Sequence, residues 1–565
     1  MPYTPGAWPT LPAMMLGRAR EWGGRPLFRY WRDGAWQRMG WDGFAQQVAS
    51  LAAHLRARGV APGDRVLLVS ENRPEFPIAD CAIMAIGAIT VPTYVTNTPA
   101  DHAHILRDSG ARAAIAANGR LAARIIQAAG EGGLDLILTM DSPEWSETMA
   151  APADVAMLEA ECHQASREAL ACLIYTSGTG GAPKGVMLPH RALLANREGL
   201  VPLAERVGFA GNPYLSFLPL SHSYEHTVGG FLLPSVGMEI VYSRGADRIA
   251  GEFAEIQPAV VTAVPRLFEV MRARMLAQRE KQSPLAQRLF DRAVALGLRK
   301  LDGPKLNLIE RVQDAVMERV VRRKVQARFG GKLLAFVSGS ARLDPDLSGF
   351  FLALGLPVLQ GYGQSEAGPV ISCNLPWANR RETVGPPMAG VNARIAADGE
   401  VLISGDLVMQ GYWGAPELTA EALRPDAEGR VWLHTGDVGA LDDGFLRITD
   451  RKRDFIKTLG GDMVSPAKVE GLLMAEPEIA QAVIAGEGRP GIVALVVPAE
   501  GQAEAVKAAV DRVNARLSNI ERVRRFATVD AFSVEDGTLT PTMKVRRRIV
   551  LDRNAALVDG LHGGH

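Results

Sequence analysis

Apolar and polar positions along residues 40–140 alternate between helical spacing and short strand-like runs. The segment 41–60, WDGFAQQVASLAAHLRARGV, places apolar side chains at helical spacing and reaches a C-cap signal at Gly59. The apolar runs at 64–72, 111–117 and 134–140 predict strands. Strands separated by helices predict a parallel α/β sheet.

The middle of the chain has a different pattern. Residues 265–331 are predicted to be helical, and they carry sixteen Lys and Arg against seven Asp and Glu. Two interpretations of this segment stay open: a solvated helical face, or a basic surface that docks on anionic lipid. Strands return near residue 333, and from residue 390 short strands with Gly and Asp turns predict a smaller β-rich subdomain.

The last part of the chain begins at a boundary placed near residue 450. It contains both helical and strand-like spacings of apolar residues. Helices are predicted at 467–475 and 501–517, and strands at 480–487 and 491–498. The final residues, DGLHGGH, are predicted to be disordered. The predicted fold class is therefore α/β, with these parts: a large N-terminal domain (1–450) of parallel-rich βαβ subdomains plus the β-rich subdomain, a small α+β C-terminal domain (451–557), and a tail (558–565).

Composition narrows the choice of function. A chain of 565 residues is too long for one ordinary core. Hydrophobic residues make up 47% and charged residues 22%, as in a soluble globular protein. Lys plus Arg and Asp plus Glu are equal at 62 each, which argues against a general nucleic-acid binder.

Cysteines and apolar stretches indicate the compartment. The four cysteines form no CxxC pair, which argues against disulfides or zinc and for a reducing compartment. The most apolar stretches, 79–95 and 228–242, are short and broken by Pro or Gly, so neither is predicted to span a bilayer. The N-terminus lacks the pattern of a signal peptide. We expect a cytoplasmic protein, and peripheral contact of 265–331 with the inner face of a membrane is one of the two interpretations that stay open for this segment.

One loop carries the clearest chemical signal. The stretch 173–190, LIYTSGTGGAPKGVMLPH, combines hydroxyls, glycines and one lysine between two apolar runs. Backbone amides of a glycine-rich turn, with hydroxyls and Lys184, form a concave anion site. A Walker P-loop is excluded because Lys184 is followed by Gly185 rather than Ser or Thr. A plain flexible linker is the third interpretation, and the flanking apolar runs argue against it.

The loop resembles a family signature. YTSGTGGAPKGV (175–186) is similar to the YTSGTTGxPKGV signature of the adenylate-forming (AMP-binding) superfamily. Further family motifs follow in the same order: GYGQSEAGP (361–369), LHTGDVG (433–439), TDRKRDFIKTLGGDMVSPAKVE (449–470) and LTPTMKVRRRIV (539–550). The resemblance covers roughly residues 20–557 and implies that a carboxylic acid attacks the α-phosphate of ATP, giving acyl-AMP and pyrophosphate. It implies ATP, Mg²⁺ and coenzyme A as cofactors and co-substrates.

The resemblance also implies site residues. The implied ATP site comprises Thr176, Ser177, Gly178, Thr179, Gly180, Gly181, Lys184, Gly339, Ser340, Ala341, Gln360, Gly361, Tyr362, Gly363, Ser365, Asp437 and Arg451. The implied catalytic residues are Lys544, Glu366, His222, Thr176 and Lys184, with Glu366 also binding Mg²⁺. The hinge of a mobile C-terminal domain is implied at Arg453, and a CoA contact at Gly460 and Gly461. Gly180 departs from the family, which has a second Thr there, so the phosphate loop has one hydroxyl fewer.

The identity of the acid substrate and of the acyl acceptor is predicted from less specific motifs. YLSFLPLSHSYEH (214–226) and VVTAVPRLFEVM (260–271) resemble long-chain fatty acyl-CoA synthetases. GGFLLPSVGMEIVY (229–242) would supply small apolar walls for an acyl tunnel or simply an ordinary core. We expect activation of a long-chain fatty acid and transfer to CoA. The alternatives are a medium-chain or other acid, a carrier protein as the acceptor, or a silent binding module, and a homodimer remains open.

Overall fold

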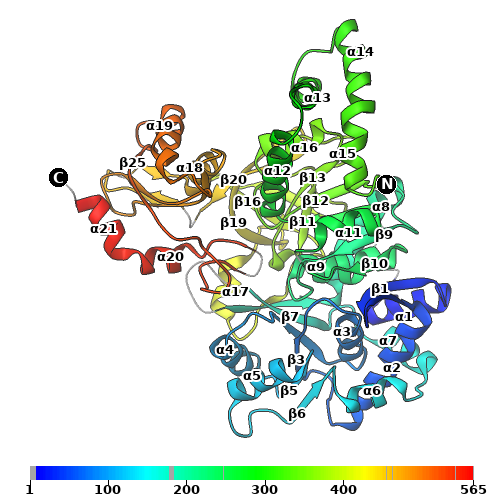
Figure 1. The fold of residues 1–565 in the computed structure, drawn as a ribbon. Coiled ribbons are helices and arrows are strands. Elements are labelled where there is room, and N and C mark those ends of the chain that lie inside the picture. Colours follow the sequence, from blue (N-terminus) through cyan, green and yellow to red (C-terminus); the bar gives the residue numbers. More distant parts are fainter. Residues whose placement is uncertain are drawn as a thin grey trace.

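Six strands of the N-terminal half and one short strand from later in the chain form the first sheet (Figure 1). The computed structural model describes residues 8–176, 183–245, 247–452, 455–460, 462–540 and 543–563. The strands lie in the order β17 (Gly411–Tyr412), β8 (Lys184–Pro189), β7 (Leu170–Thr176), β4 (Ile89–Thr93), β3 (Arg65–Val69), β5 (Ala113–Ala116) and β6 (Leu136–Thr139). The strands from β7 to β6 pair in parallel, so the predicted parallel α/β sheet is confirmed.

Helices cover this sheet because their connections must cross from one strand end to the other. They are α1 (Leu11–Trp22), α2 (Trp41–Ala57), α3 (Glu75–Ala85), α4 (Pro99–Ser109), α5 (Gly119–Ala129), α6 (Pro143–Ala150) and α7 (Val155–Gln164). The predicted helix at 41–60 is α2, whose apolar face packs on α1, α3 and α6. Helix α3 is buried along its whole length, so its amphipathic signal is weak.

A second sheet of eight strands contributes the other wall of the N-terminal part. Its order is β14 (Val370–Cys373), β13 (Val358–Gly363), β12 (Ala335–Ser338), β11 (Val260–Ala263), β9 (Pro213–Ser216), β10 (Glu239–Tyr242), β1 (Pro26–Arg32) and β2 (Ala35–Gly40). Between β8 and β11 run α8 (His190–Val207), α9 (Ser223–Thr227), the π-helix η1 (Val228–Leu232), α10 (Leu233–Ser235) and α11 (Ile249–Ile256). Helix α16 (Pro345–Ala353) lies between β12 and β13.

The predicted β-rich subdomain is confirmed as an antiparallel sheet. It contains β15 (Asn392–Ile395), β16 (Glu400–Ser404), β19 (Val431–Asp442) and β18 (Leu423–Pro425), with β20 (Phe445–Arg451) paired to β19 and α17 (Pro416–Ala422) beside it. The chain continues into a β-ribbon of β21 (Ile456–Lys457) and β22 (Met463–Val464). A last sheet contains β23 (Ile479–Ala485), β24 (Ile492–Pro498) and β25 (Val523–Thr528), with helices α18 (Pro466–Met474) and α19 (Val506–Arg516).

The predicted disorder of the C-terminal residues is wrong for 559–563. These residues belong to α21 (Ala555–Gly563), which follows α20 (Arg547–Arg553). Val558 and Leu561 are spaced to share one face of α21, and both pack on an apolar cluster that includes Leu495 and Val550. The two apolar side chains stabilise a helix that its glycines disfavour. Residues 564–565 lie outside the described part.

The basic segment 265–331 is helical, as predicted, and forms an arm that projects from the body at the top of Figure 1. Its elements are α12 (Pro265–Glu280), α13 (Pro284–Asp302), α14 (Leu308–Met317), the π-helix η2 (Glu318–Arg322) and α15 (Arg323–Arg328). The buried Arg322 ties the arm together, donating to the carbonyls of Ala353 (2.7 Å) and Ala293 (3.0 Å) and pairing with Asp314 at 2.6 Å. Within the described ranges, no helix is both long and apolar enough to cross a membrane.

Helix α13 approaches α16 closely at Gly297, and this contact predicts a stability effect. In Gly297→Ala the new methyl would lie 2.5 Å from Cα of Ala353, so the thermal midpoint is expected to fall, since overpacking costs about 1–3 kcal/mol. The matched Gly251→Ala change, in α11 with nothing within 4 Å, should keep or raise the midpoint because alanine favours helix. Thermal melts followed by circular dichroism would measure both, and equal midpoints would contradict this close packing.

Candidate active site

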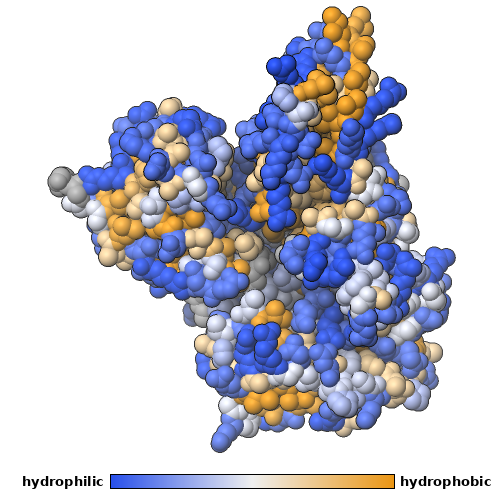
Figure 2. All heavy atoms as spheres, in the orientation of Figure 1, coloured by the Kyte–Doolittle hydropathy of each residue, from blue (hydrophilic) through white to orange (hydrophobic). Residues whose placement is uncertain are grey.

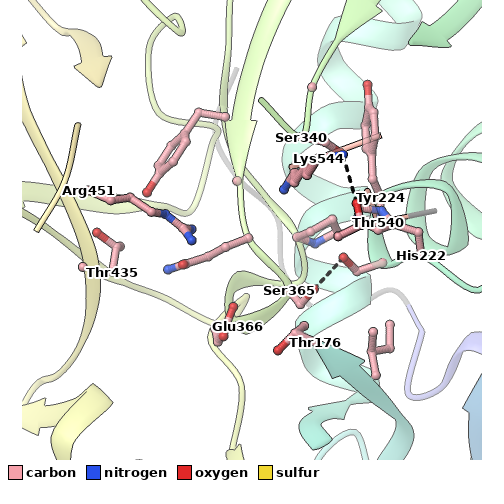
Figure 3. A pocket seen from close by; sticks show the side chains of 18 of the residues that line it. Thr176, His222, Tyr224, Ser340, Ser365, Glu366, Thr435, Arg451, Thr540 and Lys544 are labelled. Carbon is pink, nitrogen blue, oxygen red and sulfur yellow. Dashed lines mark hydrogen bonds between the residues drawn. The ribbon is translucent and has the colours of Figure 1, made fainter. Parts of the chain in front are cut away.

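One large cavity lies where the two N-terminal sheets, the β-rich subdomain and the C-terminal segment meet (Figure 3). Its volume is about 1840 Å³. Pockets for single small ligands measure roughly 300–1,000 Å³, so this one has room for more than one substrate. The predicted site residues that line it are Thr176, Lys184, His222, Gly339, Ser340, Gly361, Tyr362, Gly363, Ser365, Glu366, Arg451 and Lys544.

The remaining predicted residues fall into two groups. Ala341, Gln360, Asp437 and Gly460 are described but are not among the lining residues: Ala341 and Gly460 are exposed, and Gln360 and Asp437 are buried next to residues that do line the cavity. Ser177, Gly178, Thr179, Gly180, Gly181, Arg453 and Gly461 lie outside the described residues.

The stem of the glycine-rich loop is held by the neighbouring helix α4. Strand β7 ends at Thr176 and β8 begins at Lys184, and these two residues pair across the ladder. The Tyr175 hydroxyl donates to Oδ2 of Asp108 at 2.6 Å, and the ring Nε2 of His104 lies 2.8 Å from the carbonyl oxygen of Pro183. Burial and the Asp108 carboxylate raise the pKa of Tyr175, which therefore stays a neutral donor. Both sides of the loop are thus anchored on one helix.

Glu366 is oriented by a tyrosine that the sequence analysis missed. The Tyr412 hydroxyl, on the short strand β17, donates to Oε1 of Glu366 at 2.9 Å. The ammonium of Lys184 lies 5.3 Å from the centre of the same ring. Tyr412 therefore connects the loop lysine with the carboxylate. Only tertiary contact could reveal it, because 46 residues separate Tyr412 from Glu366.

A second carboxylate, that of Asp437 on β19, is clamped between two residues of the cavity wall. The Tyr362 hydroxyl donates to Oδ2 at 2.6 Å, and Nε of Arg451 donates to Oδ1 at 2.7 Å. Burial and the Asp437 charge hold the pKa of Tyr362 well above its usual value. Each carboxylate oxygen keeps a further lone pair for a ligand hydroxyl. The ring of Tyr362 lines the cavity while its hydroxyl is held by Asp437.

The backbone at the end of β12 is shaped for close approach. Ser340 adopts a positive φ of 68°, which is rare outside glycine. A Cβ on Gly339 would lie 3.0 Å from the Tyr224 ring, so a larger residue there would push against this ring. The Tyr224 hydroxyl in turn donates to the Val337 carbonyl on β12 at 3.1 Å. The strand end and helix α9 therefore form one continuous wall.

His222, at the N-cap of α9, is held as a neutral ring. Its Nδ1 accepts the backbone N–H of Tyr224 at 3.2 Å, which leaves the proton on Nε2. Burial, with the positive charge of Lys544, lowers the pKa of His222 to about 3. The next residue, Ser223, shares a hydrogen bond of 2.8 Å with Ser365. His222 can therefore act as a hydrogen-bond donor at neutral pH.

Lys544 reaches the cavity from the C-terminal segment. Its backbone N–H donates to Oγ1 of Thr540 at 3.0 Å, so the backbone of Lys544 is held against another residue that lines the cavity (Figure 3). The walls of the cavity desolvate the ammonium and the guanidinium of Arg451 repels it, so the pKa falls to about 8. Asp437 and Glu366 act in the opposite direction. An anionic ligand would relieve this electrostatic penalty.

Beneath α9 lies a buried carboxyl group that the sequence analysis also missed. Glu225 accepts hydrogen bonds from Tyr214 (2.7 Å), Ser216 (2.6 Å) and Thr262 (2.9 Å), on β9 and β11. Burial raises the pKa of Glu225 to about 7. A Cβ on Gly229 would lie 2.2 Å from Oε1 of Glu225, so the glycine at the start of η1 leaves room for the carboxyl group.

The part of the cavity wall formed by α8, η1 and the second sheet is apolar. The lining side chains there are Leu200, Leu203, Ala204, Val207, Phe209, Val228, Leu232, Leu233, Val260, Ala335, Val337 and Leu359. Residues Leu200 to Val207 extend roughly 10 Å along α8 at 1.5 Å per residue. The single cavity thus combines a polar, charged region with an extended hydrocarbon-like surface.

The chain is similar in sequence to known ligases. The long-chain-fatty-acid–CoA ligase FadD15 of Mycobacterium bovis (strain ATCC BAA-935 / AF2122/97) is 32% identical over 597 aligned positions, covering 99% of this chain and 98% of that protein. The long-chain-fatty-acid–CoA ligase 1 of Cavia porcellus is 30% identical, covering 89% of this chain and 79% of that protein.

Solved structures match the fold at lower identity. ATP-bound MatB from Rhodopseudomonas palustris superposes with a TM-score of 0.75 at 22% identity, over 97% of this chain and 99% of that one. MenE from Bacillus subtilis in complex with AMP superposes with a TM-score of 0.70 at 21% identity, over 95% of this chain and 97% of that one. Family models match residues 17–413 as an AMP-binding enzyme and 453–563 as an AMP-binding enzyme C-terminal domain. The chain belongs to the AMP-binding enzyme family, as its sequence motifs predict.

Proposed function

We propose that this AMP-binding enzyme is an acid–CoA ligase and that its preferred acid is a long-chain fatty acid. The observation that carries the proposal is the single cavity that joins the polar residues around Glu366 and Lys544 to an apolar wall. The acid–CoA ligase activity is supported by relatives of about 30% identity over most of the chain. The long chain is supported by the twelve apolar side chains that line the wall.

In the proposed first step, the acid carboxylate attacks the α-phosphate of ATP and pyrophosphate leaves. Thr176 and Lys184 would hold the outer phosphates beside the loop. The Lys544 ammonium would lie between the carboxylate and the α-phosphate, where it offsets the charge that both bring together. The Nε2–H of His222 would donate to the same carboxylate. The apolar wall keeps the acyl chain away from water.

The nucleoside would be held on the other side of the cavity. The Tyr362 ring offers a flat face for adenine, with Gly339 and Ser340 completing that wall. The free lone pairs of Asp437 would accept the ribose hydroxyls, while Arg451 keeps the carboxylate in place. Tyr362 and Arg451 already hold the Asp437 side chain in one position. Binding of the nucleoside would therefore lose less side-chain entropy.

The residues present fit a magnesium ion. Among the described residues, no group of three or more His, Cys, Asp or Glu could hold a metal alone. Mg²⁺ usually takes only one or two carboxylates plus phosphate oxygens and water, so the Glu366 carboxylate suffices. Tyr412 occupies Oε1 of Glu366, and no described residue donates to Oε2. When bound, the ion would neutralise charge on the phosphates.

The second step would transfer the acyl group from AMP to the thiol of CoA. We propose residues 1–450 as the adenylation domain and 451–557 as a mobile domain that changes position between the steps. Gly460 lies in the turn between β21 and β22, where the missing side chain would admit a pantetheine arm. The proposed hinge Arg453 lies outside the described residues.

The proposal is tested by pyrophosphate release with acids from acetate to oleate, with and without CoA. We expect AMP and acyl-CoA with a long-chain optimum, lost in Lys544→Ala. In Ala204→Phe the larger side chain would fill part of the buried apolar wall. The value of kcat/KM for palmitate should then fall about a hundredfold, because each lost CH₂ contact is worth about 0.8 kcal/mol. The value of kcat/KM for octanoate should stay unchanged. Activity on short acids alone would contradict the long-chain assignment, and thioester formation only on a carrier protein would contradict CoA.

The lowered pKa of Lys544 predicts an alkaline limit. The free enzyme loses the ammonium charge as pH rises through about 8, so kcat/KM for acyl-AMP formation should decline above that pH. An ordinary lysine would keep its charge to about pH 10. Lys544→Arg keeps a cation throughout, so its residual kcat/KM should lack the decline. An identical decline in the arginine variant would assign the titration to another group.

The contact between Tyr412 and Glu366 predicts a specific defect in adenylation. Tyr412→Phe should lower kcat/KM for ATP by about tenfold to a hundredfold, because a hydrogen bond to a charged group is worth about 1.5–3 kcal/mol. Thioester formation from supplied acyl-AMP should be unaffected. The control is Tyr30→Phe on β1, whose hydroxyl has no hydrogen-bond partner among the described residues. If the effects of Glu366→Gln and Tyr412→Phe on kcat/KM add up in the double variant, the two side chains do not act together and the proposed role of Tyr412 is wrong.

A further inference from the structure

The outer face of the arm carries an apolar stripe that no other part of the described chain covers. Leu308 is 78% exposed and Val312 is 67% exposed. The stripe consists of Leu308, Ile309, Val312, Val316 and Val320, on α14 and η2. Their spacing of three to four residues after the first pair places them on one side of the helix. Figure 2 shows this surface as an orange band at the tip of the arm.

The charges on and beside α14 are sorted between two faces. The acidic groups of α14 turn inward, where Glu310 pairs with Arg299 at 2.5 Å and Asp314 pairs with Arg322 at 2.6 Å. The cations that flank the stripe remain on the surface. Lys305, Arg311, Arg319, Arg323 and Lys324 are exposed and form no ion pair with any described carboxylate. The outer face is therefore apolar along its centre and positive at its rim.

This combination restricts what can cover the stripe. Contiguous exposed apolar surface on a soluble protein marks an interaction site. A second copy of the chain would place the same basic rim against itself, so like charges would oppose pairing. The surface of a bilayer with anionic lipid offers phosphate groups to the rim and the acyl boundary to the stripe. We propose that the outer face of α14, η2 and α15 docks on anionic membrane surface.

Of the two interpretations of segment 265–331, the exposed stripe and its basic rim favour docking on anionic lipid. It does not depend on which acid the enzyme activates, because the stripe lies outside the cavity and shares no residue with its lining. A helix lying in the interface plane buries one face only, which matches an arm whose other face packs on α13 through Met317 and Ala293.

Flotation of the full-length protein with vesicles tests the docking. Vesicles of phosphatidylcholine mixed with phosphatidylglycerol should bind the protein at least about tenfold more tightly than phosphatidylcholine alone, and added salt should weaken the binding. The double change Val312→Asp and Val316→Asp should reduce binding at least about tenfold, since it places charge in the centre of the contact. The double change Arg319→Glu and Arg323→Glu should also reduce vesicle binding at least about tenfold, because it replaces positive charge at the rim with negative charge.

Matched controls come from the opposite side of the molecule. Met157→Asp alters an exposed apolar residue on α7, and Arg120→Glu alters an exposed cation at the start of α5. Both should bind vesicles like wild type, and all variants should retain activity on a water-soluble acid, which shows that they fold. Unchanged vesicle binding in the stripe variants would overturn the proposal. A dimer in solution that the stripe changes break, without any vesicle binding, would also overturn it and identify a contact between copies.

Discussion

The buried carboxyl group of Glu225 is the interaction on which the cavity depends. Three hydroxyls from β9 and β11 bind it, so it fastens helix α9 to the second sheet. The helix in turn presents His222 and Tyr224 to the polar region, and the π-helix that follows presents Val228 and Leu232 to the apolar one. Burying a carboxyl group is costly unless its hydrogen bonds are complete, and here the hydroxyls complete them.

The polar region of the cavity uses paired contacts of the same kind. Asp437 is fixed by Tyr362 and Arg451, and Glu366 is fixed by Tyr412, before any ligand is present. Such preorganisation lowers the cost of ordering side chains on binding. The cations Lys184 and Lys544 are left to face the phosphates and the carboxylate. Burial and the neighbouring Arg451 lower the pKa of Lys544, while Asp437 and Glu366 raise it.

The arm shows that charge can be partitioned within one helical segment. On α14, Glu310 and Asp314 form internal pairs with Arg299 and Arg322, while the cations beside the stripe stay exposed. Part of the excess of nine positive charges in 265–331 therefore lies on the outer face, beside the stripe. Net charge counted along the sequence underestimates how one-sided this surface is.

The sequence by itself determined the order of strands and helices, the parallel α/β class and the family. Hydrophobic periodicity predicted α2, β3, β5 and β6, and the ordered motifs predicted the residues around the cavity. Periodicity reports which face of an element is buried, but it cannot say against what. The partnership of Glu366 with Tyr412, that of Asp437 with Tyr362 across 75 residues, and the hydroxyls around Glu225 therefore belong to tertiary structure.

The same limit explains the wrong prediction at the C-terminus. Glycines and polar residues predicted disorder there, and only the presence of an apolar cluster under Val558 and Leu561 makes the helix stable. Exposure of the stripe on α14 was equally beyond the sequence, because the same spacing of apolar residues would have predicted a buried face. Composition and spacing fix what a segment can bury, and the packing of distant segments decides what it does bury.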